Sequence, residues 1–286
     1  MCLVWRLDVR VRPFACGDPP MPVLSIGDTA MTYTEAGSGR PLLLIHGSLC
    51  DYRYWAPQMA AFAAICHVIA PSLRHYWPQS WDGGGEDFTT DRHARDVVAF
   101  IAELGLGPVD LCGHSRGGYI AFRVAQHHPE RVRKLILAEP GGSVGTESRR
   151  AGPTPVAAAM PEVTALIQRG ETDAGLRLFI EAIDGPRGWD RTSSAFKQMA
   201  RANARTLLGQ IQERRPPITL GDIAKIRAPT LLVGGERTPP PFPDMLNALE
   251  SALANVQRVT VPKARHAMNV ENPAAFNAAV LAFLAA

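Results

Sequence analysis

Nucleophilic catalysis needs a reactive side chain exposed at the end of a rigid element, and Ser115 occupies such a place. It lies in G-H-S-R-G at residues 113–117, where an apolar run from Val109 ends and a helical pattern begins. This G-x-S-x-G pattern exposes a serine hydroxyl when a strand, a sharp turn and a helix follow one another. Gly113 and Gly117 supply the small neighbours that a strained turn requires. We interpret Ser115 as a nucleophile at the start of a helix, where partial positive charge favours a developing oxyanion.

A serine nucleophile requires a base, and His266 has a suitable place along the chain. Serine is a weak nucleophile, so a histidine within hydrogen-bond reach must accept its proton, and a third group must orient that histidine. His266 follows the apolar run 256–261 by a short loop and precedes a closing helical pattern. The order along the chain, with the serine first and the histidine last, is typical of triads that contain a G-x-S-x-G turn.

Two backbone N–H groups are needed to hold the oxyanion that forms when the serine attacks a carbonyl. One donor should belong to Arg116, the residue after the nucleophile. The other should come from the loop after the apolar run 42–45, which ends in His46-Gly47-Ser48. Ser48 is the first candidate for this second donor of the oxyanion hole, and Leu49 is the alternative.

Hydrophobic periodicity predicts alternating strands and helices along most of the chain. Continuous apolar runs at 42–45 and 67–70 are typical of strands that are buried on both faces. We expect further strands at 23–27, 30–35, 134–138, 229–234 and 256–261, and in the run that leads to Ser115. Helices are predicted at 54–64, 91–104, 117–128, 244–254 and 272–286, and a long loop at 71–90.

Strands that alternate with helices form a mostly parallel sheet with helices on both faces, which is an α/β fold. Sites in such folds lie beyond the carboxyl ends of the strands. Between about 143 and 225 the pattern changes to short helical pieces, interrupted by Ala, Arg, Pro and Gly, without a convincing buried strand. We therefore expect an inserted helical cap at 143–225 on a core formed by residues 21–142 and 226–286.

The motifs together resemble the α/β-hydrolase fold superfamily. They are H-G-S at 46–48, G-H-S-R-G-G at 113–118, P-T-L-L-V-G-G at 229–235 and R-H-A-M at 265–268, the last followed by N-P-A-A-F. The resemblance covers roughly residues 23–286 and implies an eight-stranded, mostly parallel sheet with a cap inserted after the sixth strand. Relatives that cleave carbon–halogen bonds or open epoxides carry Asp at the nucleophile position. Ser115 therefore favours acyl transfer.

The catalytic carboxylate departs from the common pattern of this superfamily. Many relatives place an Asp shortly after the P-T-L-L-V-G strand, but Thr238 stands there in this chain. A subset, including haloalkane dehalogenase-like and zearalenone-hydrolase-like members, carries the acid after the preceding strand, where Glu139 lies. We predict Glu139 as the acid because it keeps the chain order and lies at the carboxyl end of the strand next to that of Ser115. Glu236 is the alternative, and Asp244 is a further substitute.

The predicted function is that of a cofactor-free serine hydrolase for a small apolar or aromatic ester or lactone. Two alternatives stay open: carbon–carbon bond hydrolysis or a lyase reaction on the same triad, and a non-enzymatic ligand receptor on this scaffold. No metal site is predicted. Substrate-binding positions are expected around the nucleophile, at His46, Leu49, His114, Trp55 and Trp77.

Composition and charge argue against several other classes. The 286 residues are 46% hydrophobic and 20% charged, which is ordinary for a globular protein. A net charge of +3 without a Lys/Arg block argues against nucleic-acid binding, and no apolar run approaches the length of a membrane span. The five cysteines form no C-x-x-C pair, so we expect a reducing, cytoplasmic environment. Residues 1–20 are expected to be a leader without signal-peptide character, and a homodimer is compatible with these features.

Overall fold

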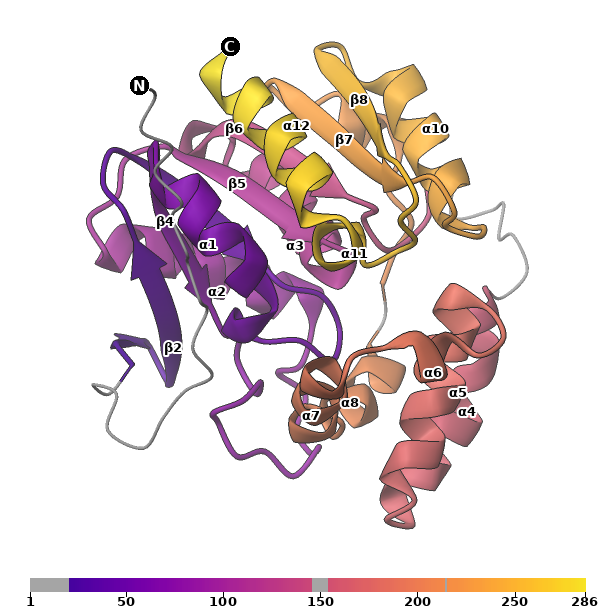
Figure 1. Cartoon of the computed structure of the whole chain (residues 1–286). Helices are drawn as coiled ribbons and strands as arrows, with labels where there is room; N and C mark the ends of the chain where they lie inside the picture. Colours follow the sequence, from indigo (N-terminus) through magenta and orange to yellow (C-terminus); the bar gives the residue numbers. More distant parts are fainter. Residues whose placement is uncertain (1–20, 146–153, 214) are drawn as a thin grey trace, which may run out of the picture.

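Eight strands form one sheet at the centre of the molecule (Figure 1). The computed structural model describes residues 21–145, 154–213 and 215–286, so the leader predicted at 1–20 lies outside the described residues. The strand order is β1-β2-β4-β3-β5-β6-β7-β8; β1–β2 and β2–β4 pair antiparallel, and the other pairs are parallel. The strands are β1 (Val23–Ile26), β2 (Thr29–Ala36), β3 (Arg40–Ile45), β4 (Cys66–Pro71), β5 (Val109–His114), β6 (Val132–Ala138), β7 (Thr230–Gly235) and β8 (Val256–Val261).

Helices cover both faces of this sheet (Figure 1). One face carries α2 (Thr90–Glu103), α3 (Arg116–His127) and α10 (Phe242–Ala252). The opposite face carries α1 (Ala56–Ala63) and α12 (Pro273–Ala285). The predicted fold class, an α/β fold with a mostly parallel eight-stranded sheet between helices, is confirmed. Four short helical segments complete the core: η1 (Tyr52–Trp55), η2 (Pro129–Arg131), α9 (Leu220–Ile223) and α11 (Met268–Glu271).

Residues 42–45 illustrate why the central strands are apolar throughout. Leu43 and Ile45 pack into the cluster that α2 and α3 share, whereas Leu42 and Leu44 pack into the cluster on the side of α1 and α12. All four side chains are fully buried. Successive strand residues point to opposite faces, and here both faces are covered, so no position tolerates a polar side chain. Each such aliphatic side chain stabilises the fold by roughly 1.5–3 kcal/mol on burial.

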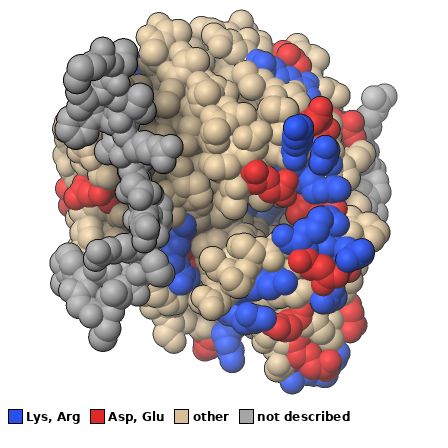
Figure 2. Space-filling view, in the orientation of Figure 1, with Lys and Arg blue, Asp and Glu red and all other residues tan. Residues whose placement is uncertain are grey.

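Five of the helices described between β6 and β7 form a separate layer over the carboxyl ends of the strands, and we call them the cap helices. They pack around an apolar cluster of their own, which also takes in Leu49 from the loop after β3. Charged side chains of both signs lie over them at the lower right of Figure 2. The cap helices are α4 (Pro155–Gln168), α5 (Thr172–Asp184), α6 (Gly188–Arg191), α7 (Ser194–Ala202) and α8 (Thr206–Gln212).

The chain returns to the core before the predicted end of the cap at residue 225. Ile218 and Ile223 belong to the same apolar cluster as α2, α3 and α10. Ile218 also pairs with the segment that leaves β6, since its N–H donates to Ser143 O at 2.7 Å and its carbonyl accepts from Gly145 N at 3.0 Å. The two connections to the cap helices therefore run side by side. The assignment of 143–225 as one inserted domain stays a prediction.

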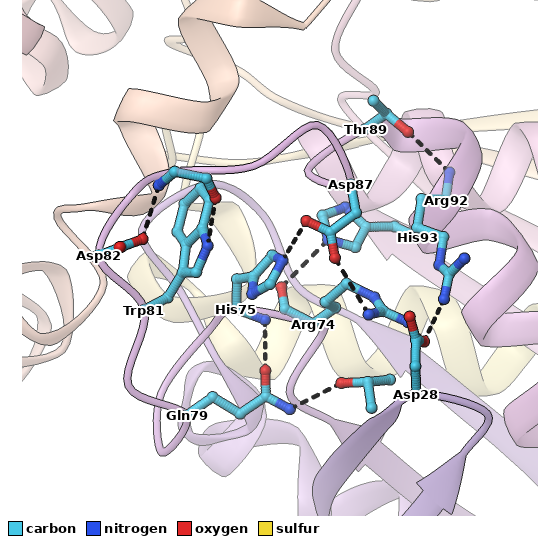
Figure 3. A network of polar contacts seen from close by, with 12 residues as sticks. Asp28, Arg74, His75, Gln79, Trp81, Asp82, Asp87, Thr89, Arg92 and His93 are labelled. Carbon is cyan, nitrogen blue, oxygen red and sulfur yellow. Dashed lines mark hydrogen bonds and ion pairs between the residues drawn. The ribbon is translucent and has the colours of Figure 1, made fainter.

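The long loop predicted at 71–90 lies between β4 and α2 and is held by a buried arginine (Figure 3). Arg74 is 3% exposed and contacts three carboxylates, those of Asp96 (2.8 Å), Asp28 (2.7 Å) and Asp87 (3.3 Å). The His75 ring points toward Asp87 (Figure 3), and its Nε2 lies 2.8 Å from Oδ1 of that carboxyl group. A planar guanidinium can serve several carboxylates at once, which a single ammonium group does less well. The loop is therefore tied to β1–β2 and to α2 at one point.

Candidate active site

The turn after β5 has the strained geometry that the G-x-S-x-G pattern predicts. Ser115 has φ 53° and ψ −119°, a conformation that non-glycine residues rarely adopt. A Cβ on Gly113 would lie 2.2 Å from the carbonyl oxygen of Gly117, and one on Gly117 would lie 2.3 Å from the carbonyl oxygen of Ile45. No side chain fits at either position, so the two glycines allow β5, α3 and the end of β3 to approach closely.

Parallel register brings the ends of the central strands to one edge of the sheet. Ile45 of β3 pairs with Gly113 of β5, and His114 pairs with Ala138 of β6. Ala138 in turn pairs with Val233 of β7. Ser48, Ser115 and Glu139 therefore follow neighbouring strands at nearly the same height. His266 reaches the same edge from the loop after β8.

Glu139 and His266 form a buried pair. Nδ1 of His266 lies 2.7 Å from Oε2 of Glu139, and Oε1 of Glu139 accepts the N–H of Gly235 at 2.8 Å. Glu139 is 1% exposed and His266 5% exposed. The carboxyl group thus fixes one ring nitrogen, while Nε2 of His266 is buried without a hydrogen-bond partner among the described residues. That free nitrogen could accept a proton from a nucleophile.

Burial dominates the electrostatics of this pair. It raises the pKa of Glu139 to about 7, although the Gly235 N–H opposes the shift by stabilising the carboxylate. Burial also lowers the pKa of His266 to about 4, and the nearby Asp184 carboxyl opposes that shift. Both shifts favour the neutral form of the group, because a low-dielectric site penalises charge. A neutral imidazole is the form that can act as a base.

The other acidic candidates lie at the surface. Glu236 is exposed and accepts the N–H of Lys263 at 2.7 Å, and Asp244 is exposed in the first turn of α10. Thr238, at the place where many relatives carry Asp, is 8% exposed and buried close to Gly235. Among the three acidic candidates, a hydrogen bond to His266 is found for Glu139. Its role as the triad acid remains a prediction.

Two cavities meet at Ser115, between the strand ends and the cap helices. The larger has a volume of about 270 Å³, and Ser115, His266 and His114 line it together with Asp184 from the end of α5. The smaller has a volume of about 100 Å³ and shares Ser48 and Ser115 with the larger one. A carbonyl at Ser115 would thus have space on both sides for the two parts of a substrate.

The predicted oxyanion donors flank this junction. Arg116 is the first residue of α3, and its N–H has no intrahelical carbonyl to bond, as at every helix start. Ser48 lines both cavities, and its hydroxyl donates to Oε1 of Gln210 at 2.7 Å. Leu49 has φ 63° and buries its side chain among the cap helices. The assignment of the two donors is a prediction that this geometry allows.

Of the five expected substrate positions, His114 lines one of the two cavities at Ser115, and the other four line neither of them. His46 is fully buried and ties two loops, because its Nε2 accepts the N–H of Leu73 at 3.0 Å while Nδ1 bonds to Gly47 O. Trp55 is fully buried and packs against Phe276 of α12. Trp77 lies under the Arg53 guanidinium, 3.8 Å from the ring centre.

Several cavity residues carry no signal in the sequence. Asp184, Gln210 and Arg215 come from or follow the cap helices, where no motif marks a position. Phe242, at the start of α10, stacks on the His266 ring with centroids 3.9 Å apart. Asp184 has a buried oxygen, Oδ1, for which the described chain offers no partner, and burial raises the pKa of this carboxyl. These contacts depend on how the cap packs, which local sequence does not encode.

Within the described residues, no group of three or more His, Cys, Asp or Glu side chains is arranged to hold a metal ion. The same residues contain no helix with the length and apolar character that crossing a bilayer requires. Cys50, Cys66 and Cys112 are buried as free thiols.

Comparison with known proteins assigns the chain to a family. A family model described as alpha/beta hydrolase family matches residues 42–279. The chain belongs to this family. The matched range begins in β3 and ends in α12, so it includes the turn at Ser115, the loop with Glu139 and the loop with His266.

Individual known proteins match nearly the whole chain. A non-heme haloperoxidase of Rhodococcus erythropolis is 29% identical over 282 residues, covering 92% of this chain and 99% of that protein. The 3-oxoadipate enol-lactonase 2 of Acinetobacter baylyi is 27% identical, covering 91% and 95%. A solved bromoperoxidase from Bacillus anthracis gives a TM-score of 0.77 at 22% identity, covering 93% of this chain and 100% of that one. The structural likeness concerns the fold.

Proposed function

We propose that this alpha/beta hydrolase family member is a serine hydrolase that cleaves a carboxylic ester or lactone through an acyl-enzyme. One observation carries the proposal: His266 contacts Glu139 at 2.7 Å through Nδ1, has no partner for Nε2 within the described parts of the chain, and lines the same cavity as Ser115. This is the arrangement of a base that is oriented by a carboxylate and faces a nucleophile.

The proposed reaction uses these groups in two steps. The Ser115 hydroxyl attacks the substrate carbonyl as Nε2 of His266 takes its proton, and Glu139 stabilises the imidazolium through Nδ1–H. The N–H groups of Arg116 and Ser48 hold the oxyanion. His266 then protonates the alkoxide as the bond between the carbonyl carbon and this oxygen breaks, which leaves an ester on Ser115. The new alcohol departs when the substrate is an open ester and stays attached to the acyl group when it is a lactone. Water attacks this ester with His266 again as base, and the acid product is released.

The size and character of the larger cavity support a small organic substrate. Most of the wall is apolar: Phe179, Ile180 and Ile183 of α5 face it from the cap, and Phe196 of α7 adds an aromatic ring. The enol-lactonase of Acinetobacter baylyi, which aligns over most of the chain, is an example of lactone chemistry in the family.

Covalent labelling by a fluorophosphonate tests the proposal. The native protein should be labelled on Ser115, and Ser115→Ala should abolish both the label and turnover of p-nitrophenyl acetate. Ser193→Ala is the matched control, because Ser193 lines the same cavity at the start of α7. Labelling should survive in that variant. A folded native protein that is neither labelled nor active on a panel of aryl esters and lactones would refute the proposal.

A further inference from the structure

The smaller cavity beside Ser115 has a guanidinium group with unused donors on its wall. Among the described residues, the charged side chains that line it are Arg116 and Arg215, both cationic. Arg116 is 1% exposed, and its end groups bond to Glu213 and to Nδ1 of His93, the latter at 3.1 Å. Arg215 bonds to Glu213 through Nη2 at 3.0 Å, but its Nε is buried without a partner in the described chain. Arg215 therefore still has an N–H group that can donate a hydrogen bond to an acceptor.

A glycine lets this guanidinium approach the nucleophile turn. Nη1 of Arg215 lies 3.3 Å from the point where a Cβ on Gly141 would stand, and the same point is 3.6 Å from the Ser115 carbonyl group. Gly141 N–H in turn donates to the Ser115 carbonyl at 2.9 Å. Any side chain at 141 would occupy the space between the guanidinium and the turn. The absence of a side chain at Gly141 therefore leaves room for the guanidinium near the Ser115 turn.

A second donor on the same wall comes from the last helix of the cap. Gln210 of α8 lines the smaller cavity, and its Oε1 already accepts the Ser48 hydroxyl proton at 2.7 Å. Its remaining polar atom is the amide nitrogen, which can only donate. Arg215 and Gln210 therefore present donors in a cavity that also contains Ser115.

The local charge is positive in the smaller cavity and differs from that in the larger one. Burial opposes ionisation of Glu213, but Arg116 and Arg215 outweigh it and hold its pKa at about 2. Two guanidinium groups around one carboxylate leave a net charge of +1. The larger cavity instead contains Asp184 and Glu271 beside Arg191. An anionic group would be attracted to the first cavity and repelled by Asp184 in the second.

We propose that the smaller cavity is a carboxylate-binding site in which Arg215 and Gln210 hold an anionic group of the substrate. The preferred substrate is then an ester or lactone that carries a free carboxylate a few atoms from the scissile carbonyl, with its apolar part in the larger cavity. This inference rests on the proposed hydrolase function and adds the substrate class. Arg215 is a specificity residue in this scheme, because a guanidinium matches the geometry of a carboxylate.

Two esters that differ in charge and by one methyl group provide the test. One is the mono-p-nitrophenyl ester of glutaric acid, and the other is the same ester with its free acid capped as a methyl ester. The native protein should favour the charged ester by roughly 10- to 100-fold in kcat/KM, the range for a hydrogen bond to a charged group, mainly through KM. Arg215→Gln should lower this ratio by the same factor, and Arg215→Lys should give an intermediate ratio. Glutarate should inhibit hydrolysis of p-nitrophenyl acetate more strongly than its diamide, and Arg215→Gln should remove that difference.

Arg169→Gln is the matched control, because it removes one positive charge from an exposed ion pair of the cap helices. Arg169→Gln should keep the native preference for the charged ester. If the preference falls as much in Arg169→Gln as in Arg215→Gln, it comes from the overall charge of the protein, and the proposed carboxylate site is wrong. A native protein that takes the fluorophosphonate label but shows neither the ester preference nor selective glutarate inhibition would overturn the carboxylate site and leave the hydrolase intact. A native protein without label or turnover would overturn both proposals.

Discussion

Replacing Glu139 by Gln tests the acid assignment most directly. The two oxygens of Glu139 serve different partners: Oε1 accepts the Gly235 N–H at 2.8 Å, and Oε2 faces Nδ1 of His266 at 2.7 Å. Glutamine has one acceptor oxygen and one donor nitrogen. If its oxygen serves Gly235, its NH₂ group faces His266 and forces the proton onto Nε2. If it is flipped, its NH₂ group meets the Gly235 N–H as a second donor.

The first orientation satisfies both partners, so it should prevail and leave His266 in the tautomer that cannot accept the Ser115 proton. Loss of the correct tautomer and of imidazolium stabilisation costs on the order of 10³- to 10⁴-fold in serine triads, or about 4–5.5 kcal/mol of transition-state stabilisation. We expect a loss of that size in kcat/KM for p-nitrophenyl acetate. Folding should be retained, because a neutral amide replaces a carboxyl group whose pKa burial raises to about 7. Circular dichroism checks this.

Glu236→Gln is the control, since Glu236 bonds to the backbone N–H of Lys263, which a glutamine oxygen can still accept. It should retain activity close to that of the native protein. Near-native activity in Glu139→Gln, combined with a large loss in Glu236→Gln or Asp244→Asn, would refute the reasoning and assign the acid to another residue.

The pH profile adds a second check. The pKa values of about 7 for Glu139 and about 4 for His266 mean that the pair takes up protons as pH falls, so kcat/KM should fall through this window.

Three further predictions concern stability. Gly117→Ala should lower the free energy of unfolding by about 3 kcal/mol or more in urea titrations, because its Cβ would lie 2.3 and 2.4 Å from two carbonyl oxygens at the end of β3. Gly107→Ala should leave the free energy of unfolding nearly unchanged, because no atom beyond its two chain neighbours lies within 4 Å of its Cβ position. Thermal melts should fall in Tm as pH drops below about 6.5, because burial lowers the pKa of His46 to about 4 and of His114 to about 3. The unfolded chain binds these protons first, the shifts of His46 and His114 being worth roughly 3 and roughly 5 kcal/mol, and a flat Tm would contradict this. Asp184→Asn should raise Tm by the equivalent of about 1 kcal/mol at neutral pH. Burial raises the pKa of this carboxyl, and its Oδ1 has no hydrogen-bond partner among the described residues, so its charge costs stability. A lower Tm would show that the charge has a partner in solution.

Strands were predictable where burial on two faces leaves a continuous apolar run. The run 42–45 lies within β3, and 67–70 lies within β4. Their ends differ by one or two residues from the prediction, because a strand ends where its neighbour stops pairing, which residue type does not reveal. β6, predicted from 134, begins at Val132 since that residue pairs with Val109 of β5. Helix bounds shift by similar amounts at their caps.

The positions of the candidate triad could be inferred from topology, whereas the walls of the cavities could not. Ser115, Glu139 and His266 each follow a strand of a parallel sheet, so their convergence depends on strand order alone. The direction of a loop side chain depends on packing. Trp55 turns toward α12 instead of the cavity, and Leu49 turns into the cap cluster. Both are apolar residues close in sequence to Ser48, and nothing in the sequence distinguishes their directions from that of a substrate contact.

The carboxylate position explains how a chain with Thr238 can still support a triad. Ala138 of β6 pairs with Val233 of β7, so the residue after Ala138 lies beside the end of β7. Glu139 has φ 41°, and its Oε1 lies 3.5 Å from the point where a Cβ on Gly234 would stand. The carboxyl group thus lies over the end of β7 although its backbone belongs to the turn after β6. For the proposed triad, the position of the carboxylate beside His266 matters more than which strand its residue follows. A Cβ at 234 would stand 2.7 Å from Leu246 Cδ1, and one at 235 would stand 2.3 Å from the carbonyl oxygen of Arg265. The two glycines of G-G-E at 234–236 therefore let the end of β7 lie close to α10 and to the loop that carries His266.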